Sequence, residues 1–504
     1  MASAGIAVAL VVLIGAGLVV LVALTRLAAR LRRPDARNDL EYWVGRQSRA
    51  REPAPLPWTA MVVLTFVAGT GAVSLQMLLY SVAGLRFGVG TIAIPWLGAL
   101  IAIAGLPHAR RTAVAMVSAP ASVSRSSRQN SIALCLTALI ALQIAYAMFF
   151  ALSFSIRGWD SWEFWFMKAR ILFTHRALTP DFPPGPSFAD YPLHMPLAVS
   201  WLYAAAGSVQ DRAAKVLYVL QFAGLLIAFN GLVRSMTSRM HALFFTALLS
   251  SVPVLVIQGA GLPPGVDGFG LYEWDQVGYS DLTLSLCFLL AGGLVCVAFE
   301  TKHAVCLYWA AFFCGVGAWT KNEGLVFACL GASAMVWAAR RRIVFGRELI
   351  ALAAIILVFI LPWSLYKSLL HVSSDYMRDT RARMNVGAFR NVPIVLSGLG
   401  SRFLKATGPI NLWFYLYAST VILNRRRLRS SPALVVDFLV VSQLMVYLCV
   451  FVMSPQEIRW SVSTTMSRVI LHVAPLGLLA AAVHAFEWGT PGGGWGEDQV
   501  AAAE

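Results

Sequence analysis

Apolar stretches long enough to cross a lipid bilayer recur along the whole of this chain. Hydrophobic residues make up 58% of its 504 residues and charged residues only 13%, with a mean hydropathy of +0.70. Such a composition is far too apolar for a soluble globular protein of this length. Since a helix needs about 20 apolar residues to cross about 30 Å of hydrocarbon, we predict an all-α polytopic membrane protein.

The positive charge of the chain, +16 in total, lies mainly in short loops between the apolar runs. Loops of this kind usually face the cytoplasm, whereas a nucleic-acid-binding protein gathers its basic residues in one stripe. We therefore expect no nucleic-acid partner. Placing every basic loop in the cytoplasm gives about thirteen spanning helices. They are expected near residues 5–25, 58–84, 90–107, 131–155, 212–233, 241–258, 281–299, 303–319, 324–340, 349–370, 408–424, 432–453 and 467–486.

This topology places several polar segments on one outer face of the membrane. They contain most of the acidic and aromatic-polar residues that lie outside the basic loops, so any active site is expected on that face. The segments are residues 156–195, 259–281, 320–323, 371–405 and 454–468. After the first of these segments, a short apolar stretch at 193–208, flanked by Pro192 and Gly207, predicts a helix that enters the membrane only partly.

The first outer segment begins with an acidic and aromatic run, WDSWE at residues 159–163. At about 100° per residue, residues 156–173 form an outer-face amphipathic helix of the kind that lies in the membrane interface. Its aromatic side is formed by Trp159, Trp162, Trp165, Phe166 and Phe173. Asp160 and Glu163 are three residues apart, so both can face one pocket. Alternatively, they merely pair with Lys168 and Arg170 in an interfacial anchor.

Three further outer segments carry polar residues at the edges of apolar helices. In DYPLHMP at 190–196, the prolines fix where the next helix begins. In GYSD at 278–281, Asp281 is either a functional acid or simply an N-terminal cap. In TKNEG at 320–324, Lys321 and Glu323 interrupt two apolar helices, and a plain polar turn would also explain them.

Arginines on the expected outer face break the usual positive-inside pattern. They are Arg378, Arg381 and Arg383 in one loop, and Arg459 and Arg468 near the mouth of the last helix. Because arginine suits bidentate contact with phosphate, these residues are candidates for binding an anion. The alternative is that each is ordinary solvated surface.

Taken in order, these segments resemble bacterial members of the GT-C glycosyltransferase superfamily, which are related to protein O-mannosyltransferases and lipid A aminoarabinose transferases. The resemblance runs from about residue 140 to 486. It rests on GWD at 158–160 with Trp165 and KAR at 168–170, on DYPL at 190–193, GYSD at 278–281 and TKNEG at 320–324, and on TMSR at 465–468 with Leu471, His472 and Pro475.

The resemblance also implies a division of the chain. A membrane catalytic domain would occupy residues 131–486, preceded by an extra N-terminal unit of about three helices at 1–130. The tail at 487–504 is rich in Gly and Ala and is predicted to be disordered.

The activity that the resemblance implies is transfer of a sugar from a polyprenyl-phosphate donor in the membrane. The acceptor, a glycan, lipid or protein, would offer a hydroxyl on the outer face of the bacterial cytoplasmic (inner) membrane. Asp160 matches the catalytic base of the first outer loop, and Asp281 matches a second acid near the start of a later helix. Family members commonly have two adjacent acids in the first loop, whereas two residues separate Asp160 from Glu163, the third catalytic candidate.

The chemistry of such a transfer suits these residue types. One carboxylate can take the proton of the attacking hydroxyl, and attack opposite the leaving group predicts inversion. Cations stabilise the departing phosphate, and we favour Lys321 and Arg468 because they lie at helix mouths. All candidates for binding the substrate or its phosphate are Lys168, Tyr191, His194, Lys321, Glu323, Arg378, Arg381 and Arg468. Asp160 with Asp281 could hold a divalent cation, Mg²⁺ or Mn²⁺, although no ligand spacing demands one.

A transporter or flippase of lipid-linked sugars is the main alternative. Transporters carry ionisable residues and broken helices near the middle of the bilayer. The expected spans here are almost free of charge and the acids lie at the outer edge, which favours the transferase. A membrane scaffold without activity would explain the interfacial helix but not the acids that converge on one face.

Overall fold

The computed structural model describes residues 2–32, 56–117, 127–178, 189–261, 277–369, 372, 386–404, 411–454 and 456–489. All regular structure in these ranges is helical. In chain order the elements are α1 (Ala2–Leu31), α3 (Trp58–Val82), α4 (Val89–Gly105), α5 (Pro107–Val117), α6 (Ser127–Ser153), η1 (Ser161–Phe166), α7 (Met167–His175), α8 (His194–Ala206), α9 (Asp211–Ala214), α10 (Val216–Met236), α11 (Arg239–Ser250), α12 (Pro253–Ala260), α13 (Asp281–Thr301), α14 (Val305–Thr320), α15 (Asn322–Arg340), α16 (Gly346–Leu369), η2 (Val386–Asn391), α18 (Val392–Leu404), α19 (Asn411–Leu423), α20 (Leu434–Val452) and α21 (Ile458–Gly489).

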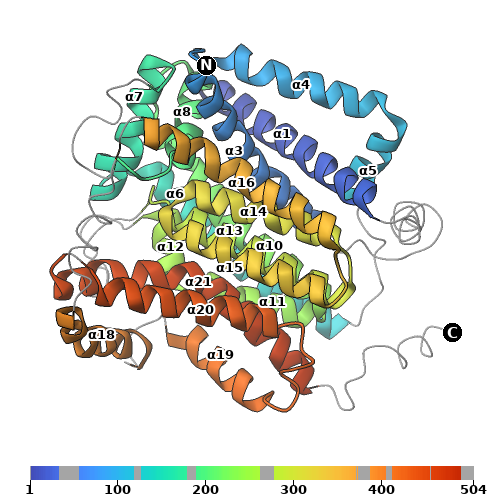
Figure 1. Cartoon of the computed structure of the whole chain (residues 1–504), viewed down its shortest axis with the longest axis vertical. Helices are drawn as coiled ribbons and strands as arrows, with labels where there is room; N and C mark the ends of the chain where they lie inside the picture. Colours follow the sequence, from blue (N-terminus) through green and yellow to red (C-terminus); the bar gives the residue numbers. More distant parts are fainter. Residues whose placement is uncertain are drawn as a thin grey trace.

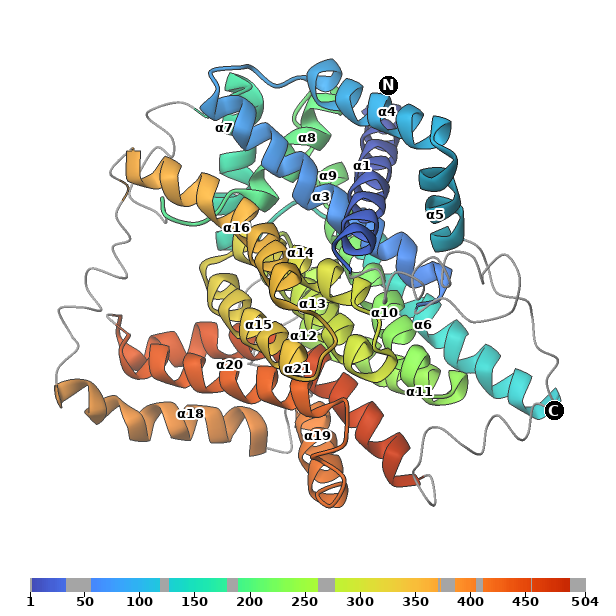
Figure 2. The ribbon, with the colours of Figure 1, turned by 45° about the vertical axis from the view of Figure 1, so that its right-hand side comes forward.

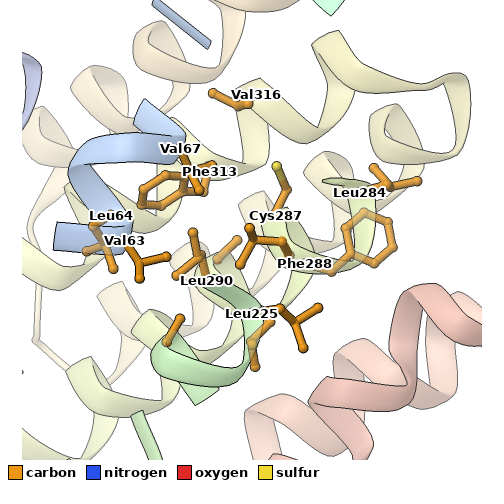
Figure 3. Packing of buried hydrophobic residues seen from close by; sticks show 14 of the residues in the cluster. Val63, Leu64, Val67, Leu225, Leu284, Cys287, Phe288, Leu290, Phe313 and Val316 are labelled. Carbon is orange, nitrogen blue, oxygen red and sulfur yellow. The ribbon is translucent and has the colours of Figure 1, made fainter. Parts of the chain in front are cut away.

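Two helices, α13 and α14, occupy the centre of the bundle (Figure 1). Every residue of α14 is buried, and so is every residue of α13 up to Ala298. A helix that is apolar on all sides can be covered on all sides, and α3, α10, α15, α16 and α21 cover this pair. Figure 3 shows side chains of this buried core, among them Val63 from α3, Phe288 from α13 and Phe313 from α14.

Two peripheral helices are equally apolar but remain exposed. Helix α4, along one edge of the bundle in Figure 2, buries only Ile92 and Ala93. The apolar span within α6 is only 11% buried. Exposed apolar surface on this scale is expected where lipid tails take the place of water. Together with the other long apolar helices, this shows a polytopic membrane protein, as the sequence predicts.

The predicted count of thirteen spans is not confirmed. Among the described residues, nine helices are long and apolar enough to cross a membrane, or eleven if two bent pairs each form one span. The pairs are α4 with the first part of α5, bent by 100°, and α11 with α12, bent by 68°. Pro107 and Pro253 begin the second helix of each pair, and hydropathy alone does not reveal such breaks. Helices α14 and α19 are apolar but shorter.

The amphipathic helix predicted at residues 156–173 differs from the structure in its aromatic face. Trp159 and Trp162 are 62% and 47% exposed, whereas Trp165 and Phe166 are buried. The reason is that η1 is a π-helical turn followed by α7. A π-turn bonds residues five apart instead of four, so a projection at 100° per residue places these rings wrongly.

The helix predicted at 193–208 is confirmed as α8, which ends at Gly207 in a left-handed conformation with φ 75°. Helix α8 lies against both α1 and α3. Because α3 also packs against α10 and α14, the N-terminal helices share one bundle with the rest of the chain.

Helices α1 and α3 cross at very close range. A Cβ atom added to Gly17 would lie 1.7 Å from the carbonyl oxygen of Thr65, and one added to Gly69 would lie 1.7 Å from that of Leu13. Small residues allow the backbones of membrane helices to approach in this way. The crossing therefore depends on glycine at both positions.

Candidate functional site

A cluster of buried charges has Asp281 at its centre. This residue is the first of α13 and is fully buried. Its Oδ1 accepts hydrogen bonds from Lys321 Nζ at 2.7 Å and from His472 Nε2 at 2.8 Å, and its Oδ2 accepts from Arg468 Nε at 3.0 Å and Nη2 at 2.8 Å. These four bonds use the lone-pair positions of an ionised carboxylate, so Asp281 holds three side chains without reaching solvent.

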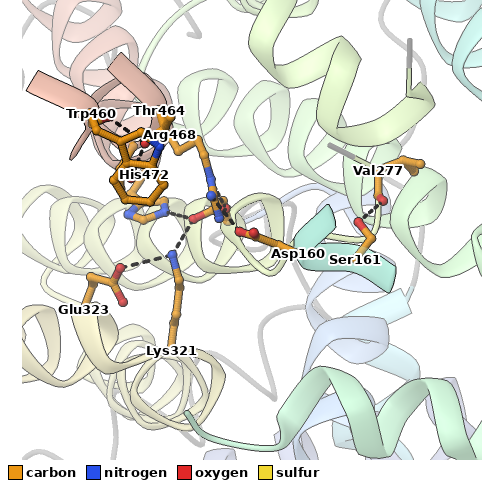
Figure 4. Close-up of polar contacts among 11 residues, drawn as sticks. Asp160, Ser161, Val277, Lys321, Glu323, Trp460, Thr464, Arg468 and His472 are labelled. Atoms are coloured by element: carbon orange, nitrogen blue, oxygen red, sulfur yellow. Dashed lines mark hydrogen bonds and ion pairs between the residues drawn. The ribbon is translucent and has the colours of Figure 1, made fainter. Parts of the chain in front are cut away.

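The two cations of the cluster each reach a second, more exposed acid (Figure 4). Arg468 Nη1 lies 2.7 Å from Asp160 Oδ2, and Lys321 Nζ lies 3.1 Å from Glu323 Oε1. The side chains of Asp160 and Glu323 are 25% and 23% exposed. The network thus runs from a buried centre to two acids at its edge. With His472 neutral, its three carboxylates and two cations carry a formal net charge of −1.

Five of the residues predicted from the sequence therefore meet in one place, although they come from four separate segments. Asp160 precedes η1, Asp281 begins α13, Lys321 and Glu323 lie where α14 meets α15, and Arg468 lies on α21. An N-terminal cap does not account for Asp281, because its carboxylate binds residues of other segments instead of its own helix. A plain polar turn does not account for Lys321, because this residue joins two helices through an ion pair.

Two residues of the cluster, His472 and Tyr447, were not among the predicted site residues. The Nδ1 of His472 lies 2.8 Å from the Tyr447 hydroxyl. Since the carboxylate of Asp281 can only accept, Nε2 of His472 carries a proton, and Nδ1 of a neutral ring then accepts from Tyr447. Arg468 and His472 are four residues apart, on one face of α21, and that spacing could have predicted His472. A single tyrosine in apolar α20 gives no such signal.

Asp160 is brought to the cluster by the packing of η1 on the loop before α13. Ser161 Oγ donates a hydrogen bond to the carbonyl of Val277. The next residue, Gly278, has φ 96°, which L-residues rarely adopt, and an added Cβ would lie 2.8 Å from Cε2 of Phe166. Glycine is therefore required for the two loops to meet. The ring centroid of Tyr279 then lies 4.4 Å from the Arg468 guanidinium carbon.

Lys321 stands in extended conformation at the break between α14 and α15. Burial by itself would lower the pKa of the ammonium group, but the charges of Asp281 and then Glu323 outweigh it and raise the pKa above its ordinary value. Lys321 is therefore a permanent cation between the two carboxylates.

A second polar group surrounds Asp190, beside the cluster. Asn322 Nδ2 donates to Asp190 Oδ2 at 2.9 Å. Burial lowers the pKa of Lys168 to about 8, and the charge of Asp190 opposes that shift. The ring of Tyr191 packs edge-on against Trp165 with centroids 5.8 Å apart, and burial followed by the charge of Glu323 raises the pKa of its hydroxyl. Lys168 and Tyr191 thus lie around this neighbouring turn.

His194, predicted to bind substrate, is fully buried and forms none of the ion pairs among the described residues. Its Nδ1 lies 2.8 Å from Thr320 Oγ1 and its Nε2 3.2 Å from Thr70 Oγ1. The ring therefore ties α8 to α3 and to the end of α14, and its contacts are structural. The predicted phosphate-binding residues Arg378 and Arg381 lie outside the described residues.

Glu163 makes none of the ion pairs found in the described ranges. The alternative in which the first-loop acids pair with Lys168 and Arg170 is also not observed. Arg170 pairs instead with Asp211, and its guanidinium carbon lies 4.5 Å from the ring centroid of Trp162. Of the two acids in this run, only Asp160 enters the cluster.

The described part of the chain contains no group of three or more His, Cys, Asp and Glu side chains placed to hold a metal ion. Arg468 stands between Asp160 and Asp281, the pair considered for Mg²⁺ or Mn²⁺. A divalent cation bound by both carboxylates would have to replace that guanidinium.

No protein family, curated protein or solved structure matches the chain. The chemistry of the site is therefore the guide to its role. A guanidinium and an ammonium group, held in place by a buried carboxylate, can bind an anion. A half-exposed carboxylate beside them can accept a proton from a bound molecule.

Proposed function

We propose that this protein is a GT-C-like membrane glycosyltransferase. It transfers a sugar from a polyprenyl-phosphate donor to an acceptor hydroxyl on the outer face of the bacterial cytoplasmic membrane. The supporting observation is the meeting of Asp160, Lys321 and Arg468 around buried Asp281. Buried ion pairs are often no more stabilising than apolar side chains of similar size. Their presence in so apolar a chain favours a functional role.

In this proposal Asp160 is the base. It takes the proton of the acceptor hydroxyl as the oxygen attacks the anomeric carbon and the bond from that carbon to the phosphate oxygen breaks. Attack from the side opposite the phosphate inverts the configuration. Arg468 and Lys321 stabilise the charge that the leaving phosphate gains. Asp281 positions both cations and does not react, because its lone pairs are occupied and it is buried.

The test is transfer of a labelled sugar by protein reconstituted in vesicles that contain polyprenyl-phosphate sugars and envelope acceptors. Asp160→Asn is expected to lower the rate at least about 100-fold, since positioned bases contribute about 10²–10⁴. Glu457→Gln, an exposed acid outside the cluster, serves as the control and keeps its rate. Transfer at the wild-type rate by folded Asp160→Asn would remove Asp160 from the mechanism.

A transporter of lipid-linked sugars is a second candidate, and two observations favour it. Asp281, Arg468 and His472 lie within candidate membrane spans, and α11 and α12 form a bent pair. Intramembrane ionisable residues and broken helices are typical of transporters. Vesicles containing only this protein and labelled carrier lipid distinguish the two. Fast movement of the lipid across the bilayer without any acceptor would favour the transporter.

A further inference from the structure

Arg468 holds two carboxylates that differ in burial. Its Nε and Nη2 bind Asp281, whose side chain is 0% exposed, and its Nη1 binds Asp160, whose side chain is 25% exposed. A partly exposed ion pair contributes little to stability because water competes for both groups. A buried pair is costly to break because an uncompensated charge stays behind. An incoming anion would therefore displace Asp160 and leave Asp281 in place.

The buried half of this bridge is also held from other directions. Lys321 and His472 both bind Oδ1 of Asp281, and the Tyr447 hydroxyl fixes the far side of the His472 ring. Asp160 has no comparable support, since Arg468 is the only cation with which it forms an ion pair among the described residues. The guanidinium thus has one fixed partner and one exchangeable partner.

We propose that a phosphate group of the ligand replaces Asp160 on Arg468, so that the base is masked in the free protein and released when the phosphate binds. Phosphate matches the bidentate geometry of a guanidinium at least as well as a carboxylate does. The exchange is a binding event and breaks no covalent bond. Its consequence for catalysis rests on the proposed function, but the exchange itself does not.

The exchange frees the carboxylate of Asp160 from the guanidinium of Arg468. In the free protein Arg468 occupies Oδ2 of Asp160, whereas the exchange leaves that oxygen able to accept a hydrogen bond from the acceptor hydroxyl. Asp160 would therefore become a competent base only when the donor is bound, and the site would be inactive without it.

Phosphate affinity of the full chain in detergent micelles provides the test, by calorimetry with inorganic phosphate and with farnesyl phosphate, a short polyprenyl phosphate. Asp160→Asn removes the competing charge, so both probes are expected to bind about fivefold more tightly, the scale of one exposed ion pair. Arg468→Gln is expected to weaken both at least about tenfold. The matched control, Glu163→Gln, makes the same chemical change at an acid that forms no ion pair with the described residues, and it leaves affinity unchanged.

Unchanged or weaker phosphate binding by Asp160→Asn would overturn the exchange, and Asp160→Ser replaces that variant if its melting temperature shows that it does not fold. Tightening for inorganic phosphate and farnesyl phosphate alike supports the exchange, because both offer the same group. If Asp160→Asn binds phosphate more tightly but the wild-type protein transfers sugar from no donor, the exchange is supported and the proposed transferase activity is contradicted. If Asp160→Asn loses sugar transfer but its phosphate affinity is unchanged, the transferase activity is supported and the exchange is contradicted.

Discussion

Asp281 and Asp160 have the same side chain and the same arginine partner, yet their surroundings give them different roles. Asp281 is enclosed by donors from α14–α15 and α21, whereas Asp160 keeps one side open. The free energy of unfolding should therefore fall by different amounts when each of the two acids is replaced. A buried charge that loses its partner destabilises the folded protein strongly, whereas an exposed charge that loses its partner is solvated by water instead.

Stability measurements can check this. Asp281→Ala leaves Lys321 and Arg468 without their shared acid and is expected to cost about 3–5 kcal/mol. Asp160→Asn is expected to cost about 1 kcal/mol or less. Thermal unfolding of both variants in the same detergent provides the comparison. Equal losses would show that the burial difference has no energetic meaning.

Lys168 predicts a dependence of stability on pH. Burial lowers its folded-state pKa to about 8 from the ordinary 10.5. Between these values the unfolded chain binds more protons, so stability rises as pH rises from about 8 to 10.5. The full gain is roughly 3 kcal/mol. The denaturation midpoint is measured across this pH range for the wild type and for Lys168→Met. The difference between the two midpoints reports on Lys168, because the other titrating groups contribute equally to both. A difference between the midpoints that does not change with pH would contradict the burial of the Lys168 ammonium group.

At this scale the sequence predicts which residues matter better than it predicts their partners. Charged residues are rare in apolar segments, so Asp281, Lys321 and Arg468 stand out by composition alone. Their pairing depends on contacts between positions up to 191 residues apart, such as that between His472 and Asp281. No local pattern contains such information, and this is why Tyr447 went unpredicted.

Among the elements, hydropathy locates the helices but not their irregularities. The regions of α13, α20 and α21 follow from apolar runs, whereas the π-turn of η1 does not. That turn determines which tryptophans are exposed to the outside of the bundle. Asp160 lies directly before the turn, so the turn also affects its position. The crossing of α1 and α3 was also not predicted, since a glycine in an apolar run does not show which helix approaches it.

The crossing gives a direct test of the helix packing. Gly69→Ala places a methyl group against the carbonyl of Leu13 and is expected to lower stability by about 1–3 kcal/mol, as overpacking does. The control is Gly98→Ala in α4, where nothing lies within 4 Å and helix propensity favours alanine. Thermal unfolding of the two variants should move in opposite directions. Similar shifts would contradict the close approach of α1 and α3.

For the whole molecule, the arrangement of the bundle predicts sidedness. Trp159 and Trp460 are both exposed beside the charged cluster, and Ser430 is exposed next to the basic run 425–429. Under the proposed topology, Trp159→Cys and Trp460→Cys react with an impermeant thiol reagent from one side of intact vesicles, and Ser430→Cys reacts only from the other. The exposed native thiols Cys135, Cys329 and Cys449 are first replaced. Labelling of Trp159→Cys and Trp460→Cys from opposite sides would exclude a shared outer site.

The position of α21 after all the other described helices has a consequence for biosynthesis. A ribosome makes Asp160, Asp281 and Lys321 well before it reaches Arg468 and His472. Until then the acid of α13 has a single cationic partner, and the bundle lacks one of the walls of its centre. Under the proposed function, a nascent protein that still lacks α21 is therefore inactive, and the charged cluster is completed only once that helix has been inserted.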